Sequence, residues 1–529
     1  MRFSTQTYQD IRQKLLAKQE IALIDVREED PFAQGHPLFA VNISLSKLDI
    51  EILSRVPRLN TDIVLYDNGE GLAEKAYQRL QALGYQQLSL LEGGLQGWKD
   101  AGGEVFIDVN SASKAFGEFV EHHKGTPSLS AQEVQKLIDD QENIVILDAR
   151  RFDEYQVMSI PSGISVPGAE LALRAKNMVK DDQTKIIVNC AGRTRSLIGA
   201  QSLINAKIGH DVYALRNGTI GWTLAQQSLA LGQQQQYLDF PERTNHAEVL
   251  AHAKSLAEKT GVQTIALEQL QQFQQDPQRT TYIFDVRAEA EYSQAHLPHS
   301  RWIAGGQLVQ ETDHYASVRG ARIVLVDDRL VRAYMTASWL AQMNWDVVVL
   351  ETDFQQAFTE KGAWTPVVAP IHVDNRIDVT QLHTWLEGNE NITILDFTTS
   401  ANYQKGHIPT AQWAFRADIE RLVQDKKIPT DQKIVVTCGT SLLAQYAVPT
   451  LQAFSSETVY VLEGGNRAWA KQFNLETDQH IYLSPRIDRY KRPYEGTDNS
   501  AQAMQDYLDW EFGLVDQLTA DATHGFFVV

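Results

Sequence analysis

The feature that most constrains this chain is a sequence pattern that occurs four times along it. Each copy has a short apolar run, rich in residues that favour β-strands, which ends in an aspartate: Asp25, Asp148, Asp285 and Asp396. A second apolar run follows, and the second residue beyond it stands 42 positions after the aspartate in every copy. The residues at that place are Asp67, Cys190, Asp327 and Cys438, so both cysteines of the chain occupy one position of the repeat.

Short apolar runs alternate with helical patterns in each copy. Runs of this length are typical of buried parallel strands, and the alternation predicts a parallel sheet with helices on both faces. Each copy spans about 110 residues, which is enough to close a core of its own. We therefore predict an α/β fold of four tandem domains, at residues 1–106, 127–231, 263–366 and 378–480, followed by a C-terminal tail at 481–529.

The tail differs in character from the repeats. It contains prolines and then an amphipathic stretch with aromatic residues, among them Tyr507, Trp510 and Phe512. Such residues indicate that the tail docks onto a domain of the chain or onto a partner, and plain packing is favoured over a functional site.

Charge and composition limit the partners. The formal net charge is -19, with 67 acidic residues against 48 Lys and Arg, so the overall field repels nucleic acid and an anionic substrate needs a local site. No apolar run approaches the roughly 18 residues of a membrane span, and the N-terminus lacks the features of a secretory signal. Two cysteines in 529 residues do not describe a disulfide framework. We predict a cytoplasmic protein that binds neither nucleic acid nor a membrane.

Further landmarks recur in register. Three copies continue as Asp-x-Arg, a Gly-His-Ile-Pro segment begins at Gly406, and a Glu-Gly-Gly turn precedes Trp98 and Trp469. Together with the cysteine loop, these motifs resemble the rhodanese superfamily over about 480 of the 529 residues. The order of four domains and a tail resembles the bacterial four-domain rhodanese-related sulfurtransferases.

Histidines recur at one repeat position, at His36, His296 and His407, with Ser159 in the second copy. No cysteines stand at ligand spacing from them, so we predict a structural role and no metal site. The Asp-x-Arg pairs also occur in copies without a thiol, which favours a bracing role over acid–base catalysis.

The second copy carries the chemistry. Cys190 opens a loop between a strand and a helix, and a reactive cysteine must be a thiolate. Inward backbone amides, a helix beginning near Ser196, and Arg193 and Arg195 would lower the pKa of the thiol and bind thiosulfate. The resemblance implies that Cys190 is the catalytic persulfide carrier and that the loop around it binds substrate, through Ala191, Gly192, Arg193, Thr194, Arg195 and Ser196.

One spacing separates this loop from related ones. Four residues stand between Cys190 and Arg195, whereas the phosphatases and arsenate reductases of the superfamily have five. The smaller loop favours sulfur transfer over hydrolysis of an anionic ester. Ser159 replaces the family's histidine, for which we expect altered packing with retained chemistry.

The other copies lack parts of this site. With no thiol at Asp67 or Asp327, the first and third domains are predicted to be noncatalytic, although Arg332 holds in the third copy the place of Arg195. Cys438 in the fourth copy has Leu443 at that place, and its Cys-Gly-Thr opening is similar to two-domain thiosulfate and mercaptopyruvate sulfurtransferases. Cys438 is therefore either a second site or a silent remnant.

The resemblance implies a rhodanese-type thiosulfate sulfurtransferase with ping-pong kinetics and no cofactor. Its partners would be a small anionic sulfur donor and a thiol, cyanide or a sulfur-accepting protein. The alternative is a noncatalytic multidomain carrier or docking scaffold, in which Cys190 receives sulfur from a partner protein. An anion hydrolase is a third alternative.

Overall fold

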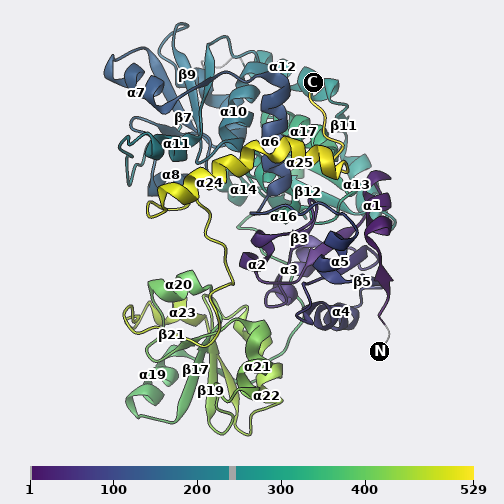
Figure 1. The fold of residues 1–529 in the computed structure, drawn as a ribbon, viewed down its shortest axis with the longest axis vertical. Helices are drawn as coiled ribbons and strands as arrows, with labels where there is room; N and C mark the ends of the chain where they lie inside the picture. Colours follow the sequence, from purple (N-terminus) through teal and green to yellow (C-terminus); the bar gives the residue numbers. More distant parts are fainter. Residues whose placement is uncertain (1–2, 238–245) are drawn as a thin grey trace.

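The computed structural model describes residues 3–237 and 246–529, and it contains four α/β domains in tandem (Figure 1). Every pair of neighbouring strands within a sheet is parallel. The strands of the first sheet lie in the order β1 (Thr5–Gln6), β5 (Gln87–Leu91), β4 (Asp62–Tyr66), β2 (Ala22–Asp25) and β3 (Val41–Asn42), and the second and third sheets repeat this order with their own strands. The fourth sheet gains one strand from the tail. The predicted α/β fold of four domains is confirmed.

Domain 1 follows the predicted alternation of strands and helices. Its elements are β1 (Thr5–Gln6), α1 (Tyr8–Leu16), β2 (Ala22–Asp25), α2 (Glu29–Gln34), β3 (Val41–Asn42), α3 (Leu48–Arg55), β4 (Asp62–Tyr66), α4 (Leu72–Ala82), β5 (Gln87–Leu91) and α5 (Gly94–Asp100).

Domain 2 repeats this order. Its elements are β6 (Ser128–Leu129), α7 (Ala131–Asp139), β7 (Ile144–Asp148), α8 (Phe152–Val157), β8 (Ile164–Ser165), η1 (Gly168–Glu170), α9 (Leu171–Arg174), η2 (Ala175–Asn177), β9 (Lys185–Asn189), α10 (Thr194–Asn205), β10 (Val212–Leu215) and α11 (Gly218–Leu224).

Domain 3 keeps the same topology. Its elements are β11 (Gln263–Ile265), α13 (Leu267–Gln275), β12 (Thr281–Asp285), α14 (Glu289–Gln294), β13 (Arg301–Trp302), α15 (Gly305–Gln310), α16 (Thr312–Tyr315), β14 (Arg322–Val326), α17 (Val331–Gln342), β15 (Asp346–Leu350) and α18 (Phe354–Ala357).

Domain 4 stands below the other three in Figure 1. Its elements are β16 (Arg376–Ile377), α19 (Val379–Glu387), β17 (Ile392–Asp396), α20 (Ser400–Lys405), β18 (Gln412–Trp413), η3 (Arg416–Asp418), α21 (Ile419–Gln424), β19 (Lys433–Thr437), η4 (Ala444–Ala447), α22 (Val448–Gln452), β20 (Val459–Leu462), α23 (Gly465–Trp469) and β21 (Ile481–Tyr482).

Four further helices of the described residues lie outside the repeats. Helix α6 (Ser111–Lys124) precedes domain 2, and α12 (His246–Lys259) precedes domain 3. The tail forms α24 (Ala501–Phe512) and α25 (Leu514–Asp521), which rise from domain 4 and lie against α6 and domain 2 (Figure 1). The tail therefore docks within the chain, as its aromatic residues indicated. Among the described residues, no helix is long and apolar enough to cross a membrane.

The domains associate in two similar pairs through the segment that follows β3 or its counterpart. In the pair of domains 2 and 3, the backbones of Gly168 and Gly306 approach so closely that a Cβ on Gly306 would lie 2.8 Å from the Cα of Gly168. In the pair of domains 1 and 4, the backbone amide of Ala417 donates to Ser46 Oγ at 3.0 Å. Ala169, Gly306, Ser46 and Ala417 each stand 21 residues after the aspartate of their own repeat.

Candidate active site

Cys190 follows the strand β9 at its carboxyl end, where function in parallel sheets usually lies. The side chain is buried, with 2% of the residue exposed. Its carbonyl oxygen accepts from the backbone amide of Thr219 at 2.9 Å, and the carbonyl of Ala191 accepts from Ile220. These bonds tie the cysteine loop to the start of α11. A Cβ on Gly218 would lie 2.4 Å from the Cys190 carbonyl, so only glycine permits this approach.

Arg195 lies in the first turn of α10 and pairs with a carboxylate. Its two terminal nitrogens donate to Glu154 of α8, each at 2.8 Å. Although burial acts to raise the pKa of Glu154, the charge of Arg195 lowers it to about 2. The Glu154 carboxylate therefore balances the positive charge of the Arg195 guanidinium.

The Cys190 thiol differs from the expectation. Burial raises its pKa above the ordinary value, and Arg195 and hydrogen bonds from Ser196 oppose burial only in part. The prediction from the sequence that these groups lower the pKa of Cys190 is therefore wrong for this structure. The physical reason for the difference is that the thiol is shielded from water while Glu154 offsets the charge of Arg195.

Arg193 points away from the cavity that Arg195 lines. Its guanidinium donates to both carboxylate oxygens of Glu118, at 2.7 and 2.8 Å, and also contacts Glu121 of the same helix α6. It stacks over Phe512 of the tail, 4.4 Å from the ring centroid. Arg193 thus connects the cysteine loop to α6 and α24.

The tail helix α24 covers the cysteine loop at Gly192. A Cβ there would lie 3.1 Å from the Tyr507 ring and 3.6 Å from Oε2 of Glu511. The Tyr507 hydroxyl donates to Glu511 Oε1 at 2.6 Å. Glu511 is fully buried and its Oε2 has no hydrogen-bond partner among the described residues. Burial, with the nearby charge of Glu118, raises the pKa of Glu511 to about 8.

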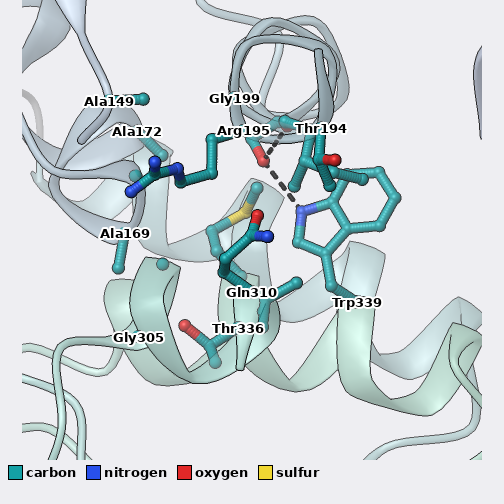
Figure 2. Close-up of a pocket in the computed structure, with 16 residues that line it drawn as sticks. Ala149, Ala169, Ala172, Thr194, Arg195, Gly199, Gly305, Gln310, Thr336 and Trp339 are labelled. Atoms are coloured by element: carbon teal, nitrogen blue, oxygen red, sulfur yellow. Dashed lines mark hydrogen bonds between the residues drawn. The ribbon is translucent and has the colours of Figure 1, made fainter. Parts of the chain in front are cut away.

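Arg195 also borders two spaces between domains. On one side, Arg195 and Thr194 face Gln310 and Trp339 of domain 3 across a pocket of about 30 Å³, room for roughly one water (Figure 2). The indole nitrogen of Trp339 donates to Ser202 Oγ there at 2.8 Å. On the other side, Arg195 and Arg150 line a cavity of about 430 Å³ that reaches domain 4 and the tail.

The comparison with known proteins identifies this architecture. The rhodanese-like domain family matches residues 8–101, 130–225, 266–358 and 378–472. The chain belongs to the rhodanese family. A crystal structure described as a thiosulfate sulfurtransferase from Pseudomonas aeruginosa is 55% identical, with a TM-score of 0.96, and the match covers 99% of this chain and 100% of that one.

Two shorter relatives match parts of the chain. Thiosulfate sulfurtransferase GlpE of Pseudoalteromonas translucida is 29% identical over 90 residues, which is 17% of this chain and 84% of the relative. The putative sulfur carrier protein YrkF of Bacillus subtilis is 24% identical over 129 residues, which is 22% of this chain and 70% of the relative.

Rhodanese domains 1 and 3 carry a carboxylate in place of the thiol. Asp67 accepts from the backbone amides of Gly69, Leu72 and Ala73 at 2.6–3.0 Å. Asp327 accepts in the same way from three amides of its own loop, at 2.8–3.3 Å. In both domains an anion that belongs to the chain therefore occupies the ring of inward amides.

Rhodanese domain 4 keeps the thiol but has Leu443 at the loop position that Arg195 holds in domain 2. Burial raises the pKa of Cys438, opposed by backbone hydrogen bonds from Ala444, Thr440 and Leu443. A Cβ on Gly439 would meet nothing within 4 Å, so one side of this loop is open. The loop continues as the short helix η4 before α22, whereas the loop of domain 2 leads directly into α10.

The repeated histidines and Asp-x-Arg pairs are structural contacts. His36, His296 and His407 stack on the aromatic residue four positions earlier, with centroids 3.8–4.1 Å apart. The backbone at this position forms an isolated β-bridge in all four domains, including that of Ser159. Arg150 pairs with Asp148 at 2.7 Å and donates to the Met158 carbonyl. No group of three or more metal-ligating side chains occurs within residues 3–237 and 246–529.

Sequence reasoning missed the partners of the loop arginines. Glu154 stands six residues after Asp148, and Glu118 and Glu121 come from a segment treated as a domain boundary. Glu291 and Arg332 in domain 3 repeat the Glu154 and Arg195 pair at the same spacing. This repeated spacing is the feature of the sequence from which the pair could have been predicted. No local signal connects the tail residues Tyr507 and Glu511 with Cys190.

Proposed function

We propose that the protein is a rhodanese-type thiosulfate sulfurtransferase that moves sulfane sulfur through a persulfide on Cys190. The match to the Pseudomonas aeruginosa thiosulfate sulfurtransferase over nearly the whole chain supports this activity. The proposal for the site rests on one observation. Among the four equivalent positions, only Cys190 combines a thiol with an arginine of its own loop that lines an interdomain cavity.

The first step takes sulfur from the donor. The Cys190 thiolate attacks the outer sulfur of thiosulfate, the sulfur–sulfur bond of the donor breaks, and its electron pair leaves with sulfite. Arg195 attracts the anionic donor into the cavity. Binding of that anion also competes with Glu154 for the guanidinium.

The second step returns the enzyme to its starting state. The acceptor attacks the outer sulfur of the persulfide, the bond between the two sulfurs breaks, and its electron pair returns to Cys190 Sγ. With cyanide the product is thiocyanate. The backbone amides of residues 191–196 stabilise the persulfide anion between the steps, as the amides of domains 1 and 3 hold Asp67 and Asp327.

The test compares the two cysteines directly. The purified protein is mixed with thiosulfate and cyanide, thiocyanate is followed, and persulfide is read as the mass of one added sulfur in the intact protein. We expect Cys190→Ser to abolish both signals and the matched variant Cys438→Ser to retain them. Loss of activity with Cys438→Ser alone would move the site to domain 4.

The alternative is a sulfur carrier that a partner protein loads. The similarity to the putative carrier YrkF and the burial of the Cys190 thiol favour it. A carrier would form little persulfide from thiosulfate, yet would accept sulfur rapidly from a persulfidated protein. Intact mass after each treatment separates the two functions, and a chromogenic phosphate ester tests the hydrolase alternative.

Three narrower expectations belong to the same proposal. Domains 1 and 3 are noncatalytic, because a carboxylate fills each amide ring. Cys438 is a candidate second site whose open loop suits a donor other than a small anion. The location is cytoplasmic, which cell fractionation checks.

A further inference from the structure

A second cavity lies between domains 1 and 3, where α16 of domain 3 packs against β3 of domain 1 (Figure 1). Its volume of about 330 Å³ is within the range of about 300–1,000 Å³ that is typical of sites for small organic ligands. Asn110, before α6, and Arg492 of the tail also border it. None of the described residues that line it belongs to the cysteine loop 190–196. A ligand in this cavity is therefore separate from the sulfur transfer.

Most of the cationic side chains in the lining are already used. The lining has four lysines and arginines, and three of them form ion pairs with carboxylates. These pairs are Arg55 with Glu51 at 2.8 Å, Arg492 with Glu29 at 2.8 Å, and Arg151 with Asp153 at 3.1 Å. Lys47 is the remaining cation.

Lys47 stands just before α3 and is half-buried. Its ammonium group forms no hydrogen bond and no ion pair with any residue that the structure describes. Burial acts to lower the pKa of Lys47, but the nearby carboxylates of Glu51 and Glu28 raise it above its ordinary value. The side chain is therefore a cation that can donate to an anionic group in the cavity.

The wall from domain 3 offers the opposite charge. Asp313 of α16 is half-buried, and its carboxylate has no hydrogen bond and no ion pair within residues 3–237 and 246–529. Burial raises the pKa of Asp313 to about 6, against the opposing charges of Arg319 and Arg55, so the carboxylate predominates at neutral pH. Glu311 also lines the cavity, and its side chain is likewise without a partner in the described part of the chain.

Unpaired charges of opposite sign thus face one cavity without meeting each other. Lys47 belongs to domain 1 and Asp313 to domain 3, and no ion pair joins them. Phe32, Leu38 and Val41 add buried apolar side chains to the lining. A ligand with an anionic group, a cationic group and an apolar side chain would form two charge-assisted contacts and bury apolar surface at once.

We propose that this cavity binds a zwitterionic α-amino acid with an apolar side chain, with the carboxylate of the ligand at Lys47 and its ammonium group at Asp313. The binding is noncovalent. Because the two charged contacts come from domains 1 and 3, the bound amino acid bridges these domains and stabilises their association.

Calorimetry of the full chain at about pH 7 tests the proposal with three probes. L-Leucine carries both charges, 4-methylpentanoate is leucine without its amino group, and 3-methylbutylamine is leucine without its carboxylate. We expect leucine to bind, and each analogue to bind roughly three- to tenfold more weakly, as for loss of one partly exposed charge-assisted contact.

Two variants assign the contacts. Lys47→Gln should weaken leucine by a similar factor and leave the affinity for 3-methylbutylamine unchanged, because that amine lacks the group that Lys47 binds. Asp313→Asn should weaken leucine and leave 4-methylpentanoate unchanged. Lys47→Arg keeps the charge and should retain binding. The matched control is Lys99→Gln, an exposed lysine of α5 in domain 1 outside the cavity lining, which should bind leucine as the wild type does.

Three results would overturn the proposal. They are the absence of leucine binding to the wild type, analogues that bind as tightly as leucine, and a Lys47→Gln variant that loses affinity for the amine as much as for leucine. The comparison of the three probes on the wild type decides the class of ligand even where a variant does not fold.

Discussion

At the scale of single residues, Glu154 controls the charge around Cys190. Arg195 is the main cation that acts to lower the pKa of the thiol, yet both of its terminal nitrogens are occupied by this carboxylate. Burial raises the pKa of Cys190. The charge of Arg195 opposes this rise only in part, because Glu154 balances that charge. An anionic donor that displaces Glu154 would meet the arginine and the thiol together.

Replacing Glu154 tests this arrangement. With Glu154→Gln, the charge of Arg195 is no longer offset, so the thiolate is favoured and the pH profile of sulfite release from thiosulfate moves to lower pH. We expect persulfide formation to be about three- to tenfold faster near pH 7, since one pKa unit is a factor of ten in thiolate. Rates between about pH 6 and 10 give the profile.

Asp153→Asn is the control for Glu154→Gln, because Asp153 lines the same cavity but pairs with the exposed Arg151 at 3.1 Å. Its profile should match that of the wild type. A shift of the Glu154→Gln profile to higher pH would contradict the role given to the carboxylate.

At the scale of elements, α24 holds the cysteine loop through a buried carboxyl. Glu511 faces Glu118 and Lys114 of α6, Arg193 of the loop, and Tyr507 of its own helix. Lys114 in turn pairs with Asp108 and lies 5.2–5.5 Å from the ring centroids of Tyr494, Tyr507 and Trp510. Through its contact with Gly192, the docked helix α24 lies directly against the cysteine loop.

The stability of this contact should fall as the pH rises. The pKa of Glu511 is about 8 in the folded chain, against 4.5 as the reference, so the folded state keeps a proton that the unfolded state loses. The stabilisation of the folded chain by protonated Glu511 is complete below about pH 4.5 and is lost by about pH 8. The free energy of unfolding falls by at most about 1.4 kcal/mol per pH unit over this interval. Glu511→Gln stays neutral, so its tail should resist proteolysis equally at pH 6 and pH 9.

Asp509→Asn, an exposed site on the same helix, should keep the pH dependence of the wild type. If Glu511→Gln and the wild type lost protection in parallel as the pH rose, Glu511 would not be the titrating group.

The elements also show what sequence can predict here. The strands that end at each aspartate could be predicted because a hydrophobic run is a local signal. The place of Cys190 at the end of a strand could be predicted from the interval between Asp148 and Cys190, which is the same in the other three copies. The role of α6 did not follow. Gly117 fits against Thr194 of α10, and Glu118 binds Arg193, but these contacts depend on how separate domains pack. For the same reason, the covering of Gly192 by Tyr507 could not be read from the tail.

At the scale of the whole molecule, domains 2 and 3 form a pair. Residues of each domain lie beside the loop arginine of the other, where water would otherwise be. Arg332 of domain 3 pairs with Glu170 of domain 2 at 2.8 Å, and also with Glu291 and Asp327. The counterpart of Glu170 in domain 3 is Gln307, which lines the cavity beside Arg195. The charged partner thus lies beside the loop arginine of domain 3, and a neutral amide holds the equivalent place beside the loop arginine of domain 2.

Removing Arg332 should therefore destabilise the pair of domains strongly. The guanidinium is fully buried, and Arg332→Met leaves the carboxylates of Asp327, Glu170 and Glu291 without their common cation. A buried ion pair that loses one partner costs about 3–5 kcal/mol, so we expect a clear fall in the midpoint of thermal unfolding. Arg279 pairs with Asp346, and their side chains are 33% and 47% exposed, so Arg279→Met should cost about 1 kcal/mol or less. Adding Asp327→Asn to Arg332→Met removes one uncompensated charge and should restore part of the loss. If this second change deepened the loss instead, the stability would depend on Asp327 as the anion of its amide ring more than on its pairing with Arg332.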